Sequence, residues 1–522
     1  MAKQAKPTLP SGLDRGDLTY AFTSSPTTAH LASELTSRDG IRPIAYKWAD
    51  QSQEVQDLIT KVWKLEELSS DDLDKLPYEE YSRYLFDPRR RFDKPEALDG
   101  IRVLEVCRPD WSVFGLQFCG SLLAEHGAEV IKIEDPAKGD AMRWAGPPPD
   151  QGGAMKAEGE NWPPHGTSLA GFCENRNKYS VTLDITSPQG REMFKDLARN
   201  VDVVIENYDP GFLDSLGIGY RQLSKINPKL IYAASNGPGQ WGRDDLPRAS
   251  YDILAQAMGG SVYITGHPDG EQLKVPIWVA DYFGGATATL GILISLLFRE
   301  KSGEGQMVEN SQLEAITRFL GPGITWYGKT GNIQERYGNR HLWVCPDGIV
   351  KASDGYVAIG ADDNACVSLW QCIGSKADGL ADKYPTNVDR VSESAQDEIY
   401  GVIEEWAAGK TVAEIESLAK RHGFGACPVK NSEDACSQIH YEERGEIQQI
   451  NDPWYGSLKT QGPVPLYSGT PGYIEVAGKP IGWDTEDVLR RFCGFTSERI
   501  KELEELHVIG KVAGAENLRD WW

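Results

Sequence analysis

From Gly100 onward, short apolar segments alternate with helical segments, and this alternation constrains the fold more than any other feature. Residues 101–107 (IRVLEVC) and 128–134 (AEVIKIE) are β-branched runs, and residues 117–127 between them have helical spacing and end at a glycine. A strand, a helix and a second strand within about 35 residues form a βαβ unit with parallel strands. Further expected elements are strands at 179–185, 202–207 and 230–236 and a helix at 187–200. The sequence therefore predicts a doubly wound α/β core.

The chain divides into parts of different texture. Its 522 residues exceed what a single hydrophobic core usually serves. Residues 1–97 form an extension in which positions 51–76 have apolar side chains at helical spacing, followed by a charged linker at 86–100. We expect a helical arm there, with packing or oligomerisation as its role. After about residue 335, two alternating runs separated by Asp-Gly and then helical stretches indicate a smaller α+β domain.

Composition argues against several classes of function. The chain has 54 basic and 77 acidic side chains, a net charge of −23, whereas a nucleic acid or an anionic membrane requires a basic protein surface. The apolar stretch 284–298 is short for a membrane span, and the N-terminus shows no apolar signal segment. Nine cysteines without a CxxC pair and eight scattered histidines favour reduced thiols in a cytoplasmic protein and indicate no metal site.

Two common catalytic motifs are missing. The first expected strand–helix turn reads CRPDWSVFG, without the GxGxxG pattern that cradles a dinucleotide. Glu134, at the position of a ribose-binding acid, is therefore better explained as a solvated charge at a strand end. The GxSxG elbow of serine hydrolases is also absent. These absences argue against a nicotinamide enzyme and against a serine hydrolase.

Asp281 is the best candidate for a reacting side chain. An expected buried strand, 276–280, precedes it and an apolar helix follows it. This would place Asp281 at the carboxyl end of a strand, where α/β sheets bind ligands, and Gly284 and Gly285 would let a substrate approach the backbone. The same pattern fits an aspartate that caps the helix, because aspartate is favoured at helix N-termini. The spacing leaves both interpretations open.

From Leu98 to about Ile509 the chain resembles the class III CoA-transferases of the CaiB/BaiF family. The resemblance lies in segments that follow one another in the family's order: LDGIRVLEVCR (98–108), AEHGAEVIKIEDPAKGD (124–140), NRNKYSVTLDITSPQG (175–190), VDVVIENYDPGFLDSLGIGY (201–220), YDILAQAMGG (251–260), ADYFGG (280–285), REKSGEGQMVENSQLEA (299–315), GNRHLWVCPDGIVKASDGYVAIG (338–360) and FGACPVKNSEDA (424–435). Each segment alone is weak, and their order makes the resemblance specific.

The resemblance implies a fold class and an assembly. We expect an α/β protein with a Rossmann-like large domain and a small α+β domain, in which two chains interlock as linked rings. Residues 98–320 would form the N-terminal part of the large domain, residues 321–450 the linker and small domain, and residues 451–522 a segment that returns to the large domain. The family gives no counterpart for residues 1–97. A homodimer is expected, with a heteromer of paralogous chains as the alternative.

The resemblance also implies the chemistry. The family nucleophile is an aspartate that corresponds to Asp281, whose ordinary pKa of about 3.9 would leave it ionised at neutral pH. It would attack an acyl-CoA to give an acyl-aspartyl anhydride, and the released thiolate would return to give an aspartyl-CoA thioester. A carboxylic acid would then collect the CoA in a site closed to water. CoA thioesters are expected as substrates, with no permanently bound cofactor.

Further site residues follow from the resemblance by position. The segment on the adenosine side of CoA corresponds to Leu183, Asp184, Ile185 and Thr186. Asn207 and Tyr208 correspond to a pair that lines the CoA channel, although a strand-end turn explains them equally well. Asn339 and His341 lie near the substrate-side loop, where a surface histidine is the alternative.

Tyr251 bears on the type of reaction. Its position, next to the active site, is tyrosine in the transferases and histidine in the related acyl-CoA racemases. A racemase needs an acid/base pair to remove and return the α-proton, and tyrosine, with a pKa of about 10, is a poor substitute for histidine. A transferase is therefore favoured, and a racemase or isomerase is the alternative.

The chain departs from the family where the CoA phosphates would bind. Family members commonly have arginines at three places that read here Asp135, Asp209 and Ser215. The partner chain or other basic residues would then hold the phosphates, and the candidates are Arg108, Arg143, Arg176, Lys178 and Arg248. A different acyl carrier, or a divergent noncatalytic subunit of a heteromeric CoA-transferase, would also explain the departure.

Three consecutive arginines, at 89–91, precede the core and stand among aromatic residues. In a chain of net charge −23 they should find acidic partners. We therefore expect the N-terminal arm to lie along a groove of its own dimer. A solvated linker is the alternative.

Overall fold

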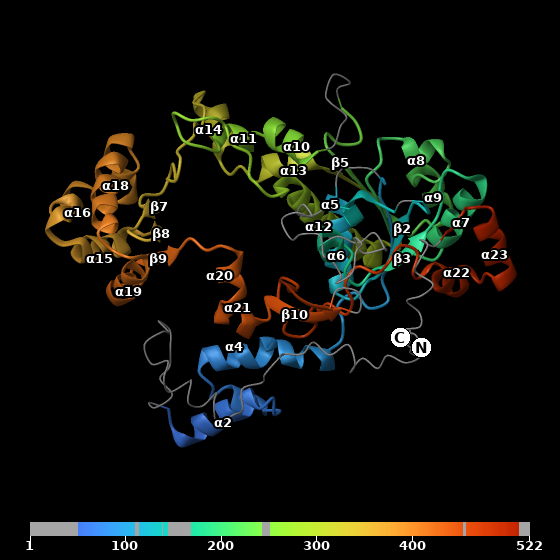
Figure 1. Ribbon diagram of the computed structural model, residues 1–522, viewed down its shortest axis with the longest axis horizontal. Coiled ribbons are helices and arrows are strands. Elements are labelled where there is room, and N and C mark those ends of the chain that lie inside the picture. The colour runs from blue at the N-terminus through green and yellow to red at the C-terminus, as the bar shows by residue number, and fades with distance from the viewer. Residues whose placement is uncertain are drawn as a thin grey trace.

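A six-stranded parallel sheet forms the centre of the larger part of the molecule (Figure 1). The computed structural model describes residues 51–109, 114–137, 139–144, 169–242, 251–452 and 456–510. The strands are β1 (Arg102–Val106), β2 (Glu129–Glu134), β3 (Tyr179–Thr182), β4 (Val203–Glu206), β5 (Ile231–Asn236) and β6 (Met307–Ser311), in the order β3-β2-β1-β4-β5-β6. Neighbouring strands are all parallel, which confirms the predicted α/β core.

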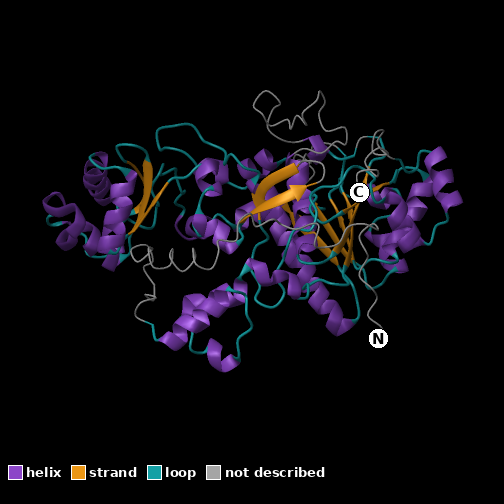
Figure 2. Cartoon of the chain, turned by 60° about the horizontal axis from the view of Figure 1, so that its bottom comes forward, coloured by secondary structure: helices purple, strands orange, loops and turns teal. Residues whose placement is uncertain are grey.

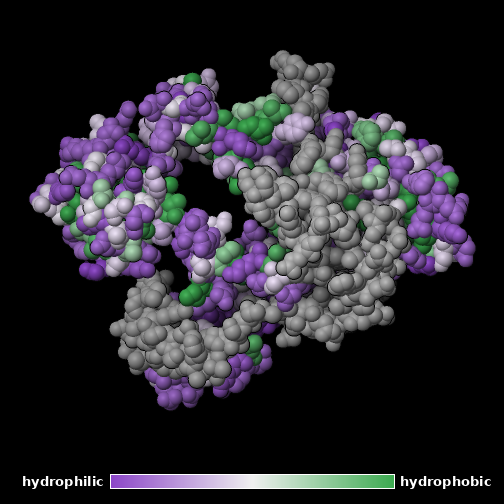
Figure 3. Space-filling model, in the orientation of Figure 1, coloured by the Kyte–Doolittle hydropathy of each residue, from purple (hydrophilic) through white to green (hydrophobic). Residues whose placement is uncertain are grey.

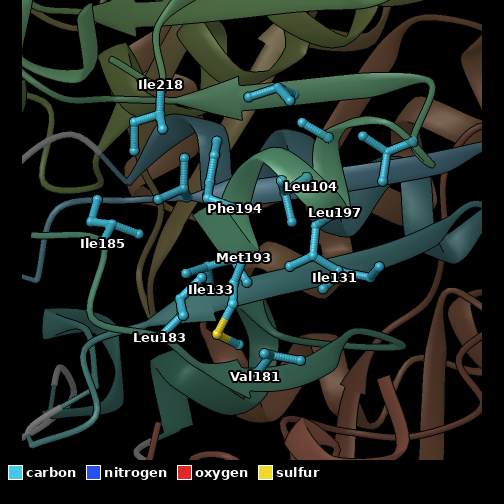
Figure 4. Close-up of a cluster of buried hydrophobic side chains, with 14 of the residues drawn as sticks. Leu104, Ile131, Ile133, Val181, Leu183, Ile185, Met193, Phe194, Leu197 and Ile218 are labelled. Carbon is cyan, nitrogen blue, oxygen red and sulfur yellow. The ribbon is translucent and has the colours of Figure 1, made fainter. Parts of the chain in front are cut away.

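Helices cover both faces of this sheet. On one face, α5 (Gly115–Glu125) and α12 (Val279–Ser302) pack against apolar side chains of β1, β4 and β5. The opposite face is covered by α7 (Pro188–Ala198), α8 (Phe212–Ser215), α9 (Tyr220–Ile226), α22 (Thr485–Cys493) and α23 (Ser497–Glu505). Figure 4 shows Phe194 and Leu197 of α7 among Leu104 and Ile131 of the sheet. The alternating pattern of the sequence thus gives a core with two apolar layers.

The C-terminal segment returns to the edge of the sheet. The backbone N–H of Thr182 donates to the hydroxyl of Thr485 at 3.0 Å, and the N–H of Asp184 donates to the carbonyl of Val508 at 2.8 Å. These bonds join residues about three hundred positions apart in the sequence, so the C-terminal segment of the described chain belongs to the same layered unit as β3.

A second, smaller unit is built on an antiparallel sheet. Its strands are β7 (Asp347–Lys351), β8 (Tyr356–Gly360) and β9 (Gly425–Pro428). The predicted Asp-Gly turn joins β7 and β8, as expected from the two alternating runs. Its helices are α15 (Asp363–Ile373), η5 (Gly374–Ala377), α16 (Leu380–Lys383), α17 (Asn387–Arg390), α18 (Glu393–Ala408) and α19 (Val412–His422). This unit has its own buried core, which includes Val357, Leu369 and Ile403.

The two units are joined so that the chain surrounds an opening (Figures 1 and 3). One connection carries α10 (Asp252–Met258), α11 (Ser261–Ile264), α13 (Gln312–Arg318) and α14 (Gly323–Thr330). The other carries α20 (Ser432–Cys436), α21 (Ile439–Arg444), β10 (Ile447–Asp452) and β11 (Gly456–Gln461). The short elements η3 (Ala141–Trp144) and α6 (Leu169–Glu174) pack together beside α5. Figure 2 shows the opposite ends of this arrangement, with the small sheet well apart from the large one.

Among the described residues, α12 is the one helix long and apolar enough to cross a membrane. The helix meets this criterion by its length and composition only, and buried helices of globular proteins also meet it. In the structure α12 packs along α5 and against β5 and β6. Its apolar composition is therefore explained in part by the core that it covers.

The N-terminal extension contains helices α2 (Gln53–Trp63), α3 (Ser70–Leu73) and α4 (Tyr78–Phe86) and the 3₁₀ helix η2 (Pro88–Asp93). Helix α2 falls within the predicted helical region, and the hydroxyl of Ser52 caps it by accepting from the N–H of Val55. Leu58, Ile59 and Val62 form a buried cluster of their own. The helices thus have a small core that is separate from the cores of the two larger units.

Arg89 and Arg90, in the run of three arginines, have acidic partners inside the extension itself. Arg89 pairs with Asp87 at 2.6 Å, and Arg90 pairs with Glu67 at 3.0 Å. The extension meets the rest of the chain at Arg83, 3.6 Å from Glu443. The ammonium of Lys94 also donates to the carbonyl of Ser468 at 2.7 Å. Contact with a dimer groove stays a prediction.

Deletion of residues 1–85 tests whether the extension supports the chain that it contacts. Because the deletion removes the small N-terminal core and Arg83, we expect the apparent Tm to fall by about 4 °C or apolar surface to become accessible to a dye. Deletion of residues 1–50 alone is the matched control, since it leaves α2 and α4 in place. If the larger deletion leaves stability, oligomeric state and activity unchanged, the extension is dispensable.

Candidate active site

Asp281 lies in the first turn of α12, and the strand predicted at 276–280 is absent. Pro276, Ile277 and Trp278 form a bend, with Ile277 57% exposed, and the helix begins at Val279. The apolar run resembled a strand, but Pro276 has no N–H to donate and these residues have no strand partner in the part of the chain that the structure describes. Asp281 is not the N-cap, because Trp278 occupies that position, but it does lie in the first turn, at the positive end of the helix dipole.

The Asp281 carboxyl lies where the first turns of helices α5, α12 and α13 come together. The Oδ1 atom accepts from the backbone N–H of Gly115, the first residue of α5, at 3.2 Å. It also accepts from the side-chain amide of Gln312, the first residue of α13, at 2.5 Å. Helices α5 and α13 follow the carboxyl ends of β1 and β6, so Asp281 reaches the predicted edge of the sheet through these neighbours.

Two glycines make this arrangement sterically possible. A Cβ atom at Gly115 would lie 2.6 Å from the backbone oxygen of Asp281, and one at Gly285 would lie 2.3 Å from the backbone oxygen of Gly115. Any larger residue would push α5 and α12 apart. Gly285, predicted to admit a substrate, thus serves the close contact of two helices.

Burial changes the acidity of Asp281, whose side chain is almost inaccessible. Desolvation raises its pKa well above the ordinary value, and the nearby negative charge of Asp252 raises it further. The backbone N–H groups of Gly115 and Phe114 oppose this shift, because they favour the carboxylate. The expectation of an ordinary pKa near 3.9 is therefore wrong for this closed site.

Asp252 is the second carboxyl of the site, at the first position of α10. One oxygen accepts from the N–H of Ala280 at 2.8 Å, and the other accepts from the amide of Gln256 at 2.6 Å. Asp252 therefore ties α10 to the start of α12. Its neighbour Tyr251, predicted to lie beside the reaction, is the N-cap of α10 and is half exposed.

Aromatic side chains from the starts of α5 and α12 pack together beside the backbone groups that bond to Asp281. Phe114 meets Trp278 and Tyr282 edge to face, with ring centroids 5.0 and 5.3 Å apart. Tyr282 also meets Phe118, and its hydroxyl donates to Glu174 at 3.3 Å. Asp281 itself is buried, and a site closed to water suits intermediates that hydrolyse easily.

The residues predicted on the adenosine side of CoA lie together just after β3. Leu183 and Ile185 point into the core. The carboxylate of Asp184 accepts from the N–H and the hydroxyl of Thr186, at 2.9 and 2.6 Å. This turn ends β3 at Thr182, three residues earlier than predicted.

Asn207 and Tyr208 lie at the carboxyl end of β4. The side-chain oxygen of Asn207 accepts from the N–H of Arg108 at 2.7 Å, which joins the ends of β4 and β1. Tyr208 stacks on Phe212 with centroids 4.9 Å apart. Beside them, burial raises the pKa of Glu206 to about 7. These contacts explain both residues as parts of a strand-end turn, and they also leave a polar edge where a ligand could bind.

Most of the basic residues predicted to hold phosphates are buried in ion pairs. Arg143 pairs with Glu134 at 2.6 Å, Arg176 with Glu125 at 3.3 Å and Lys178 with Glu105 at 2.8 Å. Their side chains are at most 10% exposed, which favours structural roles over phosphate binding. Glu134, interpreted as a solvated strand-end charge, is buried as well.

Arg108 is the exception, because its side chain is 27% exposed at the edge of the sheet. It pairs there with Asp209 at 2.7 Å, one of the positions where the family has arginine. Of the other two positions, Asp135 accepts from the N–H of Ala137 and Ser215 donates to the carbonyl of Phe212. Arg248 lies outside the described residues.

Asn339 and His341 belong to the approach to β7 in the small unit. Their backbones bond to β7, and β7 lies across the opening from α12 in Figure 1, so one chain does not bring them to Asp281. Asn339 borders a cleft of about 630 Å³ beside α14 and α18. The ring nitrogen Nδ1 of His341 accepts from the N–H of Trp343 at 3.1 Å.

Sequence reasoning missed Gln312, Asp252 and the backbone of Gly115. The available signal for Gln312 was a polar residue between the short run MVENS and a helical segment, and for Gly115 a glycine in the turn after the first strand. Asp252 stood next to Tyr251, which was singled out. Across the described ranges, no group of three or more His, Cys, Asp or Glu side chains is arranged to hold a metal ion.

Comparisons with known proteins agree over most of the chain. The sequence model of CoA-transferase family III matches residues 98–485. Succinyl-CoA–D-citramalate CoA-transferase of Chloroflexus aurantiacus is 33% identical over 421 residues, which cover 80% of this chain and 98% of the relative. The beta subunit of succinyl-CoA–L-malate CoA-transferase from that organism is 32% identical over 419 residues, or 79% and 98%. A CaiB/BaiF family protein from Brucella suis superimposes with a TM-score of 0.64 at 28% identity, over 76% of this chain and 100% of that one.

Replacement of Lys178 by methionine distinguishes a structural lysine from a ligand-binding one. The change leaves part of the buried charge of Glu105 uncompensated, so we expect a loss of about 3 kcal/mol in the free energy of unfolding, measured by denaturant titration. Lys195→Met is the control, because its partner, Glu192, is 69% exposed and is left in water when the lysine is lost. Unchanged stability with a large rise in the KM for the ligand would contradict the structural role.

Replacement of Asp281 by asparagine tests the raised pKa. A carboxyl whose folded pKa is raised binds its proton more tightly in the folded state, so the wild type loses stability as the pH rises from about 4 toward that pKa. We therefore expect Asp281→Asn to exceed the wild type in Tm by about 2 °C at about pH 8 and by less at about pH 4. Asp382→Asn, on the surface of α16, should show no such trend. A difference independent of pH would refute the assignment.

Proposed function

The chain belongs to CoA-transferase family III, the CaiB/BaiF family, and we propose that this CoA-transferase moves CoA from an acyl-CoA to a carboxylic acid through covalent intermediates on Asp281. One observation carries the proposal. The carboxyl of Asp281 is buried at the carboxyl edge of the sheet, where its Oδ1 atom accepts from the N–H of Gly115 and from the amide of Gln312. In the proposed reaction the other oxygen, Oδ2, attacks the thioester.

The proposed reaction has four steps. Oδ2 attacks the thioester carbonyl carbon, the carbon–sulfur bond breaks, and CoA leaves as the thiolate with the electron pair. The thiolate then attacks Cγ of Asp281 and expels the donor's acid, which takes Oδ2 with it. The acceptor carboxylate attacks Cγ of the resulting thioester, releases the thiolate and supplies a new oxygen. Attack of the thiolate on the acceptor's acyl carbon yields the product and restores Asp281.

The relatives support a choice of substrates. Both are named for succinyl-CoA as donor and a hydroxy dicarboxylic acid as acceptor. We therefore propose succinyl-CoA as the first donor to test, with small dicarboxylic acids as acceptors. The adenosine end of CoA would lie at the turn after β3. Arg108, at the sheet edge, would leave its ion pair with Asp209 and bind the CoA phosphates.

The assembly is proposed to be an interlocked dimer in the cytoplasm. Support comes from the outer side of α12, where Leu290, Ile294 and Leu297 are more than half exposed at helical spacing. Such an apolar stripe needs a partner surface. The beta-subunit relative makes a heteromer with a paralogous chain an alternative to the homodimer.

The test combines Asp281→Ala with labelling of the intermediate. We expect loss of the nucleophile to lower kcat by at least about 10³-fold, while Asp382→Ala remains active. Hydroxylamine added to the wild type with succinyl-CoA should modify the peptide that contains Asp281. An ¹⁸O-labelled acceptor acid should also leave ¹⁸O in that peptide, because the acceptor replaces Oδ2.

Retention of full transfer by Asp281→Ala would refute the covalent role. An acyl-CoA that exchanges its α-hydrogen with heavy water, in the absence of any acceptor, would instead indicate a racemase or isomerase. A protein that transfers CoA only when a paralogous chain is added would indicate a subunit of a heteromer.

A further inference from the structure

Gln312 makes the shortest hydrogen bond to the candidate nucleophile, and no established role accounts for it. It follows β6 directly and opens α13, whose start is capped by the hydroxyl of Ser311. Its side chain is completely buried, with Nε2 2.5 Å from Oδ1 of Asp281. A Cβ atom at Gly284 would touch its Cγ at 3.4 Å, so the surrounding packing is tight.

Fold stability does not explain a glutamine at this position. The side-chain oxygen of Gln312 is buried and has no hydrogen-bond partner among the residues that the structure describes. A buried acceptor without a partner costs about 1–3 kcal/mol, a cost that a leucine of similar size would avoid. The interaction that offsets this cost is the hydrogen bond from its nitrogen to Asp281.

We infer that Gln312 is a catalytic hydrogen-bond donor, which together with the N–H of Gly115 holds Oδ1 of Asp281 and stabilises the negative charge that forms there during transfer. This inference rests on the proposed function. It adds a named residue and a specific atom to the proposed reaction.

The charge arises when the CoA thiolate attacks Cγ of the acyl-aspartyl anhydride. The carbon–sulfur bond forms, and the electron pair of the Cγ–Oδ1 double bond moves onto Oδ1. Collapse restores the double bond and breaks the bond from Cγ to Oδ2, which leaves with the donor's acid. The same charge appears when the acceptor carboxylate attacks the thioester. Donors placed at Oδ1 before the reaction stabilise both of these states.

Gln312 also acts on the resting enzyme. A donor to the ionised form of a carboxyl favours that form, whereas burial and Asp252 disfavour it. Loss of the amide donor should therefore raise the pKa of Asp281 further. Since the attacking species is the carboxylate, the acid limb of the activity profile should then move to higher pH.

The experiment compares Gln312→Leu with the wild type in steady-state kinetics with succinyl-CoA and an active acceptor. We expect kcat to fall by about 10²–10³-fold, the usual cost of one lost oxyanion donor. The KM for succinyl-CoA should change by less than about threefold, since the lost interaction is made mainly in the transition state. The acid limb of kcat/KM should shift to higher pH.

Gln448→Leu is the matched control. Gln448 in β10 is also a buried glutamine whose nitrogen donates to a backbone carbonyl, that of Gly445 at 2.8 Å, and its oxygen also has no partner in the described part of the chain. It should leave kcat and the pH profile unchanged. Gln312→Glu is the second variant, because it keeps the size and adds a carboxylate beside Asp281. We expect it to move the acid limb at least as far as Gln312→Leu does.

The inference and the proposed function fail in different ways. If Gln312→Leu or Gln312→Glu folds and keeps the wild-type kcat and acid limb, the role of Gln312 is overturned and that of Asp281 is untouched. If kcat falls equally in Gln448→Leu, the effect is structural and the inference is overturned. If Asp281→Ala remains fully active, the proposed function itself is refuted.

Discussion

The backbone contact between α5 and α12 is the constraint on which the site depends. Gly115 and Gly285 have no side chains, and each would carry a Cβ atom within 2.6 Å of the opposing backbone. Only this approach brings the first N–H of α5 within hydrogen-bond distance of Asp281. Because α5 follows β1, the contact also fixes α12, whose first turn holds the carboxyl, at the carboxyl edge of the parallel sheet.

The buried basic side chains form structural ion pairs away from Asp281, so the charged groups that surround Asp281 are acidic. Lys178 and Arg143 neutralise Glu105 and Glu134 inside the sheet region. Asp281, by contrast, has carboxyl neighbours, Asp252 and Glu174, that raise its pKa together with burial. Burial makes the carboxylate form of this nucleophile less stable than it would be in water. The carboxylate is correspondingly more reactive once it forms, and the hydrogen-bond donors to Asp281 determine how readily it forms.

The sequence predicted what local pattern determines. The predicted bounds of β1, β2 and β4 agree with the structure to within a residue, because short apolar runs between helical segments indicate buried parallel strands. The bend at Pro276 was mistaken for a strand, since apolar composition alone does not say whether a segment has strand partners. Lys178 was taken as a ligand because its partner, Glu105, lies 73 residues away and is invisible to local reasoning. Gln312 was missed for the same reason.

In a single chain, the apolar side chains of α12 are exposed and the predicted substrate-side residues do not reach Asp281. A partner chain could account for both features. Helix α12 holds Asp281 in its first turn and presents Leu290, Ile294 and Leu297 to solvent further along. His341 and Asn339 lie beside β7 in the other unit and do not reach Asp281 within the same chain. A partner that covers the stripe would therefore fix the helix that carries the nucleophile. Assembly and the geometry of the site would then depend on the same element, which is a physical reason to expect activity from the oligomer and not from the isolated chain.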